Sequence, residues 1–238
     1  MQNASPVRTS PLLASLGWLD HAFLPAGMAP PAEAASGHQR HTPTVVMSEE
    51  AFPPKRCEAD GVIAVDTRPV AVYTADCLPV LIADTRHHHV AAVHAGLKGA
   101  LAGVLDQAVK QLCDLGAIPE SLFVAIGPAI APCCYELGED MLETITANPR
   151  VTAPGWFSSQ PINPQAVRPQ ARATHQGIWF DLPGLGKQML LDMKIPAAQI
   201  DVLPVCTYCS AEPQSSYRRN THFSDGYALR YAWIQRRE

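Results

Sequence analysis

Short apolar runs dominate the middle of the chain and are separated by polar or glycine-containing stretches. Three of them are rich in Val, Ile and Ala and predict strands that are buried on both faces or nearly so: GVIAVD (61–66), VAVYTADCLPVLIAD (70–84) and HVAAVHAG (89–96). Further strands are expected in the second half of the chain, at SLFVAIGPAI (121–130), QIDVLPVCTYC (199–209) and GYALRYAWIQ (226–235).

A longer period marks the helices. In GALAGVLDQAVKQLCDLGA (99–117) one helical face is apolar and Gly116 is a natural C-terminal stop; the face consists of Leu101, Val104, Leu105, Ala108, Val109 and Leu112. GEDMLETI (138–145) and DLPGLGKQMLLDM (181–193) predict two more helices. Residues 25–54 and residues 148–178 show no clear period and are expected to be loops, the second a long loop or lid. The mixture predicts an α/β protein.

Composition narrows the class of protein. The 238 residues, 47% of them hydrophobic, can bury a full core, and we expect one domain over residues 1–238. The formal net charge is −4 and Lys and Arg form no stripe, so nucleic acid is not an expected partner. The sequence shows neither a secretion signal nor a run long enough to span a bilayer, so we expect a cytoplasmic protein without a membrane partner. Seven cysteines then favour reduced thiols with metal or redox roles over a disulfide framework.

Cys77 and His94 stand alone in two neighbouring apolar runs. If the two strands form a hairpin that turns at Thr85 and Arg86, Cys77 lies directly opposite His94. Opposed residues have Cβ atoms about 4.5 to 5.5 Å apart, which suits a thiolate and an imidazole that reach one metal ion. The alternative is a buried cysteine beside a core histidine that hydrogen-bonds a carbonyl.

HAGLKG follows the second strand and leads into a helix. Gly96, Lys98 and Gly99 lie where backbone N–H groups at a helix start, together with the lysine ammonium, favour an anion such as phosphate. A short Gly-x-x-Gly segment is also compatible with an ordinary turn.

Six segments, in order, resemble the motifs of one family over roughly residues 39–233. They are ADGVIAVD, TADCLPVLIAD, VAAVHAGLKG, AIGPAIAPCCYELGED, WFDLPGLGKQML and CTYCSAEPQSSYRRN. The chain is therefore identified as a member of the YfiH-type family, whose members are called laccase-domain proteins, polyphenol oxidoreductases or peptidoglycan editing factor. Residues 1–38 match only weakly. The resemblance implies a mixed β-sheet sandwich with flanking helices.

The resemblance also implies a metal site. The three ligands of the family, from its Gln-x-His, Ala-Asp-Cys and His-Ala-Gly motifs, correspond to His41, Cys77 and His94. Three such ligands leave a fourth position for water or substrate on Zn²⁺, and Cu²⁺ can occupy the same kind of site. The family is associated with phosphorolysis of adenosine, inosine and methylthioadenosine and with deamination of adenosine, so the implied substrates are a purine nucleoside and phosphate.

Two features depart from the family pattern. Its usual Trp-Arg after His-Ala-Gly is Leu97-Lys98 here, and lysine lacks the bidentate fork of arginine. The segment before the Gln-x-His motif, HAFLPAGMAPPAEAASGHQRH, is shortened and has no arginine in the expected place. Both departures bear on the substrate.

Other cysteines, histidines and arginines need an interpretation. CTYC (206–209) resembles a redox motif or half of a four-cysteine zinc site. It lies near the C-terminus, far from any N-terminal βαβ unit, and the sequence has no second Cys-x-x-Cys, so we expect it to be structural or to line the pocket rather than to be a redox centre. Cys133 and Cys134 are expected near the metal site, and the histidines at 87–89 in solvent. Arg218 and Arg219 are either a solvated pair or include one anion contact in the pocket.

Several functions compete with nucleoside chemistry. A multicopper laccase uses repeated His-x-His pairs, and the sequence has only His87 and His89. A cytidine-deaminase-like enzyme needs His-x-Glu, which is missing. A peptidoglycan editing hydrolase that acts on a mis-aminoacylated muramyl precursor needs the same metal and is therefore an alternative. Polyphenol oxidation by a copper form is a second alternative. The third is a binding protein without turnover.

Overall fold

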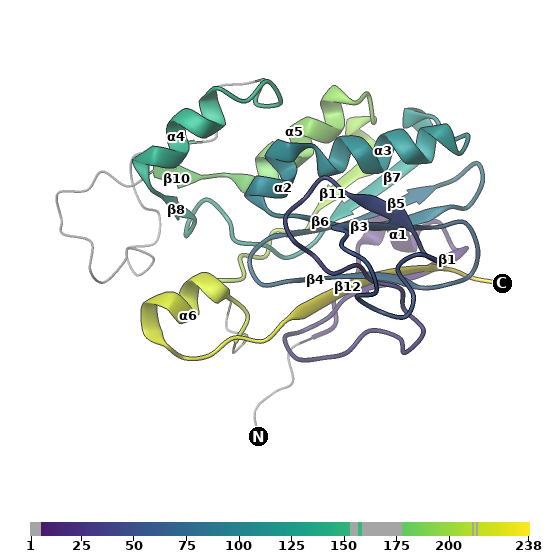
Figure 1. Ribbon diagram of the computed structural model, residues 1–238, viewed down its shortest axis with the longest axis horizontal. Helices are drawn as coiled ribbons and strands as arrows, with labels where there is room; N and C mark the ends of the chain where they lie inside the picture. Colours follow the sequence, from purple (N-terminus) through teal and green to yellow (C-terminus); the bar gives the residue numbers. More distant parts are fainter. Residues whose placement is uncertain (1–5, 153–156, 159–177, 211, 213) are drawn as a thin grey trace.

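Two facing β-sheets form the body of the protein (Figure 1). The computed structural model describes residues 6–152, 157–158, 178–210, 212 and 214–238. The larger sheet has the order β11-β7-β5-β6-β3-β2; its strands are β2 (Val45–Met47), β3 (Gly61–Ala64), β5 (Leu78–Asp84), β6 (Val90–Ala95), β7 (Leu122–Ile126) and β11 (Ile200–Val202). The smaller sheet consists of β1 (Leu19–Phe23), β12 (Arg230–Arg236) and β4 (Val70–Thr74), in that order. The expected mixed β-sheet sandwich is thus confirmed.

Three helices cover the outer face of the larger sheet in Figure 1, namely α2 (Leu97–Ala102), α3 (Val104–Asp114) and α5 (Leu182–Asp192). The remaining elements lie around the sandwich: α1 (Pro11–Ala14), α4 (Glu139–Thr146), α6 (Tyr217–Phe223), and a small sheet of β8 (Glu136–Leu137), β9 (Phe157–Ser158) and β10 (Ile178–Phe180). Short 3₁₀ turns precede β7 and β11, at Pro119–Ser121 and Ala197–Gln199.

The larger sheet is buried on both faces. Val80 and Ile82 of β5 pack in the cluster that includes α3 and α5, whereas Leu81 and Ala83 pack against the smaller sheet. All seven residues of β5 are buried. This double burial explains why the central strands are continuous apolar runs rather than alternating ones.

The helix expected at 99–117 is divided into α2 and α3. Gly103 separates them with φ 95°, a left-handed conformation in which it is both the C-cap of α2 and the N-cap of α3. A Cβ at this position would also lie 2.7 Å from the Arg150 guanidinium. The predicted apolar face is nevertheless buried in full, and Gly116, at φ 101°, follows the end of α3 as expected.

The predicted hairpin is wrong in two respects. First, residues 70–84 do not form one strand, because the backbone turns at Asp76, at φ 89°, and β4 and β5 belong to different sheets. Second, His94 pairs with Pro79 and not with Cys77, which lies just before β5. The turn is shifted because the Asp84 carboxylate accepts the backbone N–H groups of Arg86 and His87 at 3.1 and 3.0 Å.

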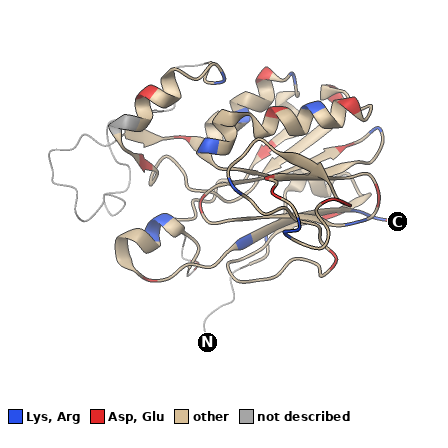
Figure 2. Cartoon of the chain, in the orientation of Figure 1, with Lys and Arg blue, Asp and Glu red and all other residues tan. Residues whose placement is uncertain are grey.

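Several expectations concern regions outside the sheets. Most of the loop or lid expected at 148–178 lies outside the described residues. Among the described residues no helix is both long and apolar enough to cross a bilayer. Figure 2 shows acidic and basic positions interspersed along the helices that cover the larger sheet.

Candidate metal centre and adjoining cavity

Three ligand-type side chains meet at one end of the sandwich. His41 comes from the loop before β2, Cys77 from the break between β4 and β5, and His94 from β6. Their ligand atoms all lie within 4.8 Å of one another. The Cys77 Sγ is 3.7 Å from His41 Nε2. The ring centroids of His41 and His94 are 4.8 Å apart, with an angle of 72° between the ring planes. The structure therefore brings together the three residues that the motifs single out, despite the different strand register.

The Asp60 carboxylate organises the His41 loop. It accepts the backbone N–H groups of Arg40, His41 and Thr42 at 3.0, 2.9 and 2.8 Å. His41 has φ 61°, a conformation that few residues other than glycine adopt and that curves successive N–H groups around one anion. The Asp60 carboxylate thus holds the strained backbone at His41, and it also contacts His94.

The same Asp60 also orients His94. Its Oδ1 lies 2.7 Å from His94 Nδ1, and both side chains are buried. Burial raises the pKa of the Asp60 carboxyl, but hydrogen bonds from His94, Thr42 and Arg40 outweigh this effect and hold the pKa well below its ordinary value. An ionised Asp60 favours the imidazole tautomer of His94 that carries its proton on Nδ1, and this tautomer leaves the Nε2 lone pair available to a metal ion.

Asp60→Asn is expected to weaken zinc binding about 10- to 100-fold, because an amide cannot hold the same imidazole tautomer with a full negative charge. Competition with a chelating dye measures the affinity. Asp66→Asn, a change at an exposed carboxylate, is the matched control. Equal affinities for Asp60→Asn and the control would contradict the positioning role of Asp60.

Gly96 is required by the close approach of the ligands. A Cβ at this residue would lie 2.7 Å from the Cys77 Sγ and 2.7 Å from His41 Cδ2, closer than real Cβ atoms come to neighbours. Steric crowding therefore explains why residue 96 of the HAGLKG segment is glycine, whether or not the segment binds phosphate.

Two further residues of the motifs fasten the ligand loops. The Gln39 amide exchanges hydrogen bonds with the Tyr73 backbone, at 2.7 and 2.8 Å, and so ties the His41 loop to β4. The buried Asp76 carboxylate accepts from the hydroxyls of Thr207 and Ser216 at 2.6 and 2.9 Å and from the Arg218 N–H at 2.7 Å. The break in the predicted strand is therefore anchored to the C-terminal part of the chain.

A cavity of about 320 Å³ opens beside the three ligands. Its walls combine the ligands with tyrosines and apolar residues: Gln39, His41, Tyr73, Thr74, Ala75, Cys77, His94, Tyr217, Tyr227 and Leu229. Tyr217 and Tyr227 are half exposed, and their rings meet edge to face at 5.1 Å. Sequence reasoning missed these tyrosines, because no spacing connects residue 73 with residues 217 and 227.

The donor set fits a zinc ion. Two imidazoles and one thiol at this spacing match a site with three protein ligands. Burial, followed by the charges of Asp76 and Asp60, raises the pKa of the Cys77 thiol to about 12. A divalent cation in contact with the sulfur is the kind of charge that holds the thiolate form at neutral pH.

The other predicted binding residues lie outside the cavity wall. Lys98 is exposed in the first turn of α2, and its charge lowers the pKa of His41, after the larger effects of burial and of His94. A Cβ at Gly99 would lie 3.6 Å from the His41 backbone, an ordinary van der Waals contact, so this position does not require glycine for steric reasons. Arg218 lies over the Tyr135 ring at 5.4 Å, while Arg219 pairs with Asp225 at 2.9 Å. Of the two arginines, Arg219 belongs to a partly exposed ion pair.

Four of the other six cysteines form a separate group. The sulfurs of this group, from Cys133, Cys134, Cys206 and Cys209, lie within 4.8 Å of one another. The two cysteines of CTYC therefore do have two further thiols beside them. These come from adjacent cysteines at 133 and 134, and not from a second Cys-x-x-Cys motif. A hydrogen bond from Cys134, with backbone N–H groups of Cys209 and Ala131, lowers the pKa of Cys206 to about 5. The structure contains no disulfide among the seven cysteines.

The histidine run at 87–89 lies at the hairpin turn. His87 and His88 are exposed as expected, whereas His89 is half-buried. Asp84, His87 and His89 come close together, but Asp84 already accepts the Ser121 hydroxyl at 2.5 Å as well as the turn N–H groups. This group therefore stabilises the turn.

Comparisons with known proteins agree with this architecture. A sequence profile described as multi-copper polyphenol oxidoreductase laccase matches residues 21–235, which extends the match beyond the segment 39–233 that the motifs covered. Bacillus licheniformis YfiH superposes with a TM-score of 0.78 at 20% identity, covering 98% of this chain and 100% of that one. YlmD from Geobacillus stearothermophilus gives 0.77 at 20% identity and covers 100% of this chain and 98% of that one.

Relatives named for an enzymatic activity are more similar to this chain in sequence than these two solved structures are. The purine nucleoside phosphorylase of Streptomyces coelicolor is 34% identical over 69% of this chain and 59% of its own length. That of Bacteroides thetaiotaomicron is 29% identical over 67% of this chain and 56% of its own. Adenosine deaminase RL5, from an unknown prokaryote, is 27% identical over 76% of this chain and 68% of its own. The chain thus spans less than two thirds of the two phosphorylases. With the profile match, it belongs to the multi-copper polyphenol oxidoreductase laccase family, as a YfiH-type member.

Proposed function

We propose that the protein is a zinc-dependent enzyme of purine nucleoside chemistry, which carries out phosphorolysis of adenosine, inosine and methylthioadenosine and deamination of adenosine. The observation that carries this proposal is a cavity of about 320 Å³ with His41, Cys77 and His94 on one wall and tyrosines on the others. Cavities of roughly 300 to 1,000 Å³ suit small ligands. The names of the relatives support the same class of substrate.

Different residues of the chain would bind the metal, position its ligands and contact the purine. His41, Cys77 and His94 would hold a zinc ion that supplies a Lewis acid at the cavity wall. Asp60 orients His94 and curves the His41 loop, and Asp76 positions the backbone before Cys77. The exposed faces of Tyr217 and Tyr227 offer aromatic surface on which a flat purine can stack.

Phosphorolysis also needs a place for phosphate. The reaction replaces the bond between the purine nitrogen and the ribose C1′ with a bond from C1′ to a phosphate oxygen, so the anion must reach the sugar. The first turn of α2 begins at Leu97, directly after Gly96, which packs against Cys77 and His41. N–H groups at the start of a helix and the Lys98 ammonium favour an anion at this end of the centre.

The direct test uses purified, zinc-loaded protein. With adenosine and phosphate we expect release of adenine and ribose 1-phosphate, and with adenosine alone slow formation of inosine. A mis-aminoacylated muramyl precursor is offered in parallel as the substrate of an editing hydrolase. Turnover of that precursor without any turnover of nucleosides would replace this proposal with the editing function.

Copper provides a second comparison. Cu²⁺ binds most N/S sites more tightly than zinc, so the same three ligands are expected to accept it. The family description names polyphenol oxidation. We expect oxidation of a phenolic dye to be confined to copper-loaded protein, and nucleoside turnover to be found in the zinc form. Fast phenol oxidation by the protein as isolated, without nucleoside turnover, would favour the oxidase.

Lys98→Ala is expected to raise the phosphate concentration needed for adenosine phosphorolysis about 10- to 100-fold. A charge-assisted contact is worth about 1.5 to 3 kcal/mol, and each 1.4 kcal/mol corresponds to a factor of ten. Zinc content and phosphate-independent deamination should change little. Initial rates at varied phosphate measure the effect.

Lys110→Ala is the matched control, because Lys110 is also an exposed helical lysine but pairs with Asp114 on α3. Equal loss of both activities in Lys98→Ala would indicate a defect in folding or in metal binding. An unchanged phosphate dependence would move the anion site to another cation, with Arg218 the next to test.

A further inference from the structure

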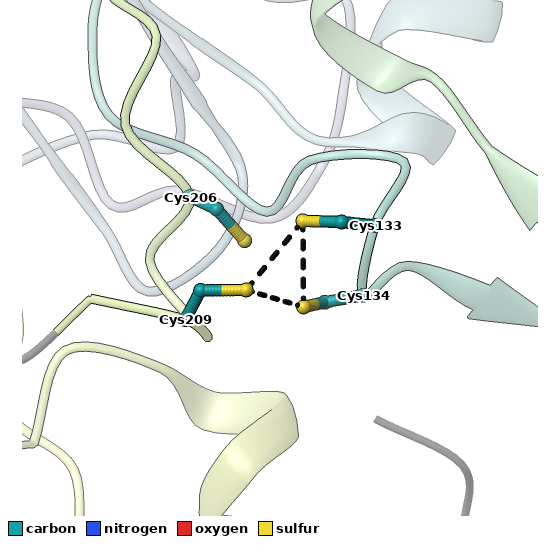
Figure 3. A group of neighbouring side chains, drawn as sticks. All are labelled: Cys133, Cys134, Cys206 and Cys209. Atoms are coloured by element: carbon teal, nitrogen blue, oxygen red, sulfur yellow. Dashed lines mark hydrogen bonds between the residues drawn. The ribbon is translucent and has the colours of Figure 1, made fainter. Parts of the chain in front are cut away.

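Four cysteine sulfurs converge at a point that the proposed nucleoside chemistry does not use. Figure 3 shows Cys133 and Cys134 in one turn and Cys206 and Cys209 in another, with their side chains directed toward one another. The Cys134 and Cys209 sulfurs are 2.9 Å apart, and Cys133 is 3.5 Å from each of them. All four sulfurs lie within 4.8 Å of one another.

Main-chain hydrogen bonds fix the two turns side by side. The segment after β7 runs parallel to the segment after β11, and the Thr207 N–H donates to the Ala129 carbonyl at 3.0 Å while the Ala129 N–H donates to the Val205 carbonyl at 3.2 Å. Each turn closes on itself, with Cys134 N–H to Ala131 and Ser210 N–H to Cys206, both at 2.9 Å. The convergence therefore follows from the backbone and not from mobile side chains alone.

The spacing suits one tetrahedral ion. Four sulfurs bound at about 2.3 Å in a tetrahedron lie about 3.8 Å from each other, within the range seen here. An iron–sulfur cluster is also held by four cysteines, but it places several atoms between them and needs sulfurs farther apart. The Ala131 N–H donates to the Cys206 sulfur at 3.4 Å, the type of contact that stabilises a thiolate ligand.

The surroundings suit a site that is closed to substrate. Cys134 is buried, and Ile130, Trp179 and Tyr208 pack around the group. Cys209 is exposed, so an ion can enter from one side. Soft thiolates select zinc over harder cations, and four protein ligands leave no open position for catalysis.

We propose that Cys133, Cys134, Cys206 and Cys209 bind one zinc ion as a four-thiolate structural site, separate from the centre of His41, Cys77 and His94. The site would staple the turn that leads into Tyr135 to the turn that carries Thr207. Thr207 lies between the two C-terminal cysteines and donates to Asp76, the residue before Cys77. The four-thiolate site therefore supports the backbone beside the candidate metal centre without taking part in its chemistry.

Zinc analysis of tag-free protein tests the proposal. We expect about two zinc ions per chain in the unmodified protein and about one in the double variant Cys206→Ser/Cys209→Ser. Cys77→Ala should also retain about one, and that ion reports on the four-thiolate site whether or not the nucleoside activity is real. Cys57→Ser/Cys113→Ser, which changes two cysteines outside the cluster, is the matched control and should keep both ions.

A spectroscopic measurement guards against a variant that fails to fold. X-ray absorption at the zinc edge of Cys77→Ala should show four sulfur neighbours at about 2.3 Å. The unmodified protein should show a sulfur-rich average of the two sites. Neither measurement requires mutation of the four cysteines.

Three results would overturn the proposal. One is zinc content that does not change between the unmodified protein and Cys206→Ser/Cys209→Ser. Another is a remaining ion in Cys77→Ala with only nitrogen and oxygen neighbours that is lost in His87→Ala, which would mean adventitious binding at the histidine run. The third is a Cys134–Cys209 disulfide, found by mass spectrometry in freshly purified protein that contains no second metal.

Discussion

Cys77→Ala is expected to lower the zinc content by about one ion per chain and to reduce adenosine phosphorolysis at least about a thousand-fold. A metal that acts as a Lewis acid contributes several kcal/mol to the transition state, and each 1.4 kcal/mol is a factor of ten. Two imidazoles alone do not complete the three-ligand set. Elemental analysis and initial rates of adenine release measure the two effects.

Cys113→Ala is the matched control for this change, because it removes a half-buried thiol of α3 that belongs to neither candidate metal site. The control should keep its zinc and its activity. Undiminished zinc in Cys77→Ala would refute the ligand assignment. Normal zinc loss with normal phosphorolysis would instead separate the metal from the reaction and would refute the proposed mechanism.

Glu212→Gln is expected to lower the free energy of unfolding by about 3 to 5 kcal/mol at neutral pH. Glu212 is buried between Arg230, which is 3% exposed, and Arg8, whose Nη2 is 2.8 Å away. Removal of the negative charge leaves the Arg230 guanidinium buried without a counter-charge. Urea denaturation followed by circular dichroism gives the difference, with Glu49→Gln, an exposed glutamate, as the control.

The effect should depend on pH. Burial raises the pKa of Glu212, but hydrogen bonds and charges from Arg230 and Arg8 outweigh it and hold the pKa below its ordinary value of 4.5. A carboxyl with a depressed pKa in the folded state adds stability above the unfolded pKa and loses it as the pH falls through the folded one. The difference between the unmodified protein and Glu212→Gln should therefore shrink below about pH 4.

A second variant separates lost charge from lost packing. Glu212→Gln/Arg230→Met removes both buried charges, so it should be less destabilised than Glu212→Gln alone. A double variant as unstable as the sum of both single changes would show that packing and hydrogen bonds, and not the isolated guanidinium, cause the loss.

The sequence by itself determined the strands that are buried on both faces and, through the family resemblance, the three candidate metal ligands. Continuous apolar runs are a local property that follows from double burial, so β3, β6 and β7 were predictable. The motifs around His41, Cys77 and His94 were readable because each lies within a short segment. Family membership followed from six segments in order along the chain, two of which contain Cys77 and His94, and the sequence profile confirmed it.

Only the tertiary structure decided how these segments meet. The register of β5 and β6 depends on a turn in which the Asp84 side chain captures backbone N–H groups, and the break at Asp76 depends on partners more than 130 residues away, Thr207 and Ser216. The division of the predicted helix at Gly103 was hidden because its apolar period continues across the glycine.

The same reason applies to the sites. The tyrosines of the cavity and the four cysteines come from segments that are distant in sequence, and no local pattern encodes their proximity. Cys133 and Cys134 complete the set begun by Cys206 and Cys209 because a parallel contact between Ala129 and Cys206 aligns two turns. The sequence specifies the chemistry of each side chain, but the packing of whole sheets and turns sets the distance between two side chains that are far apart in the sequence.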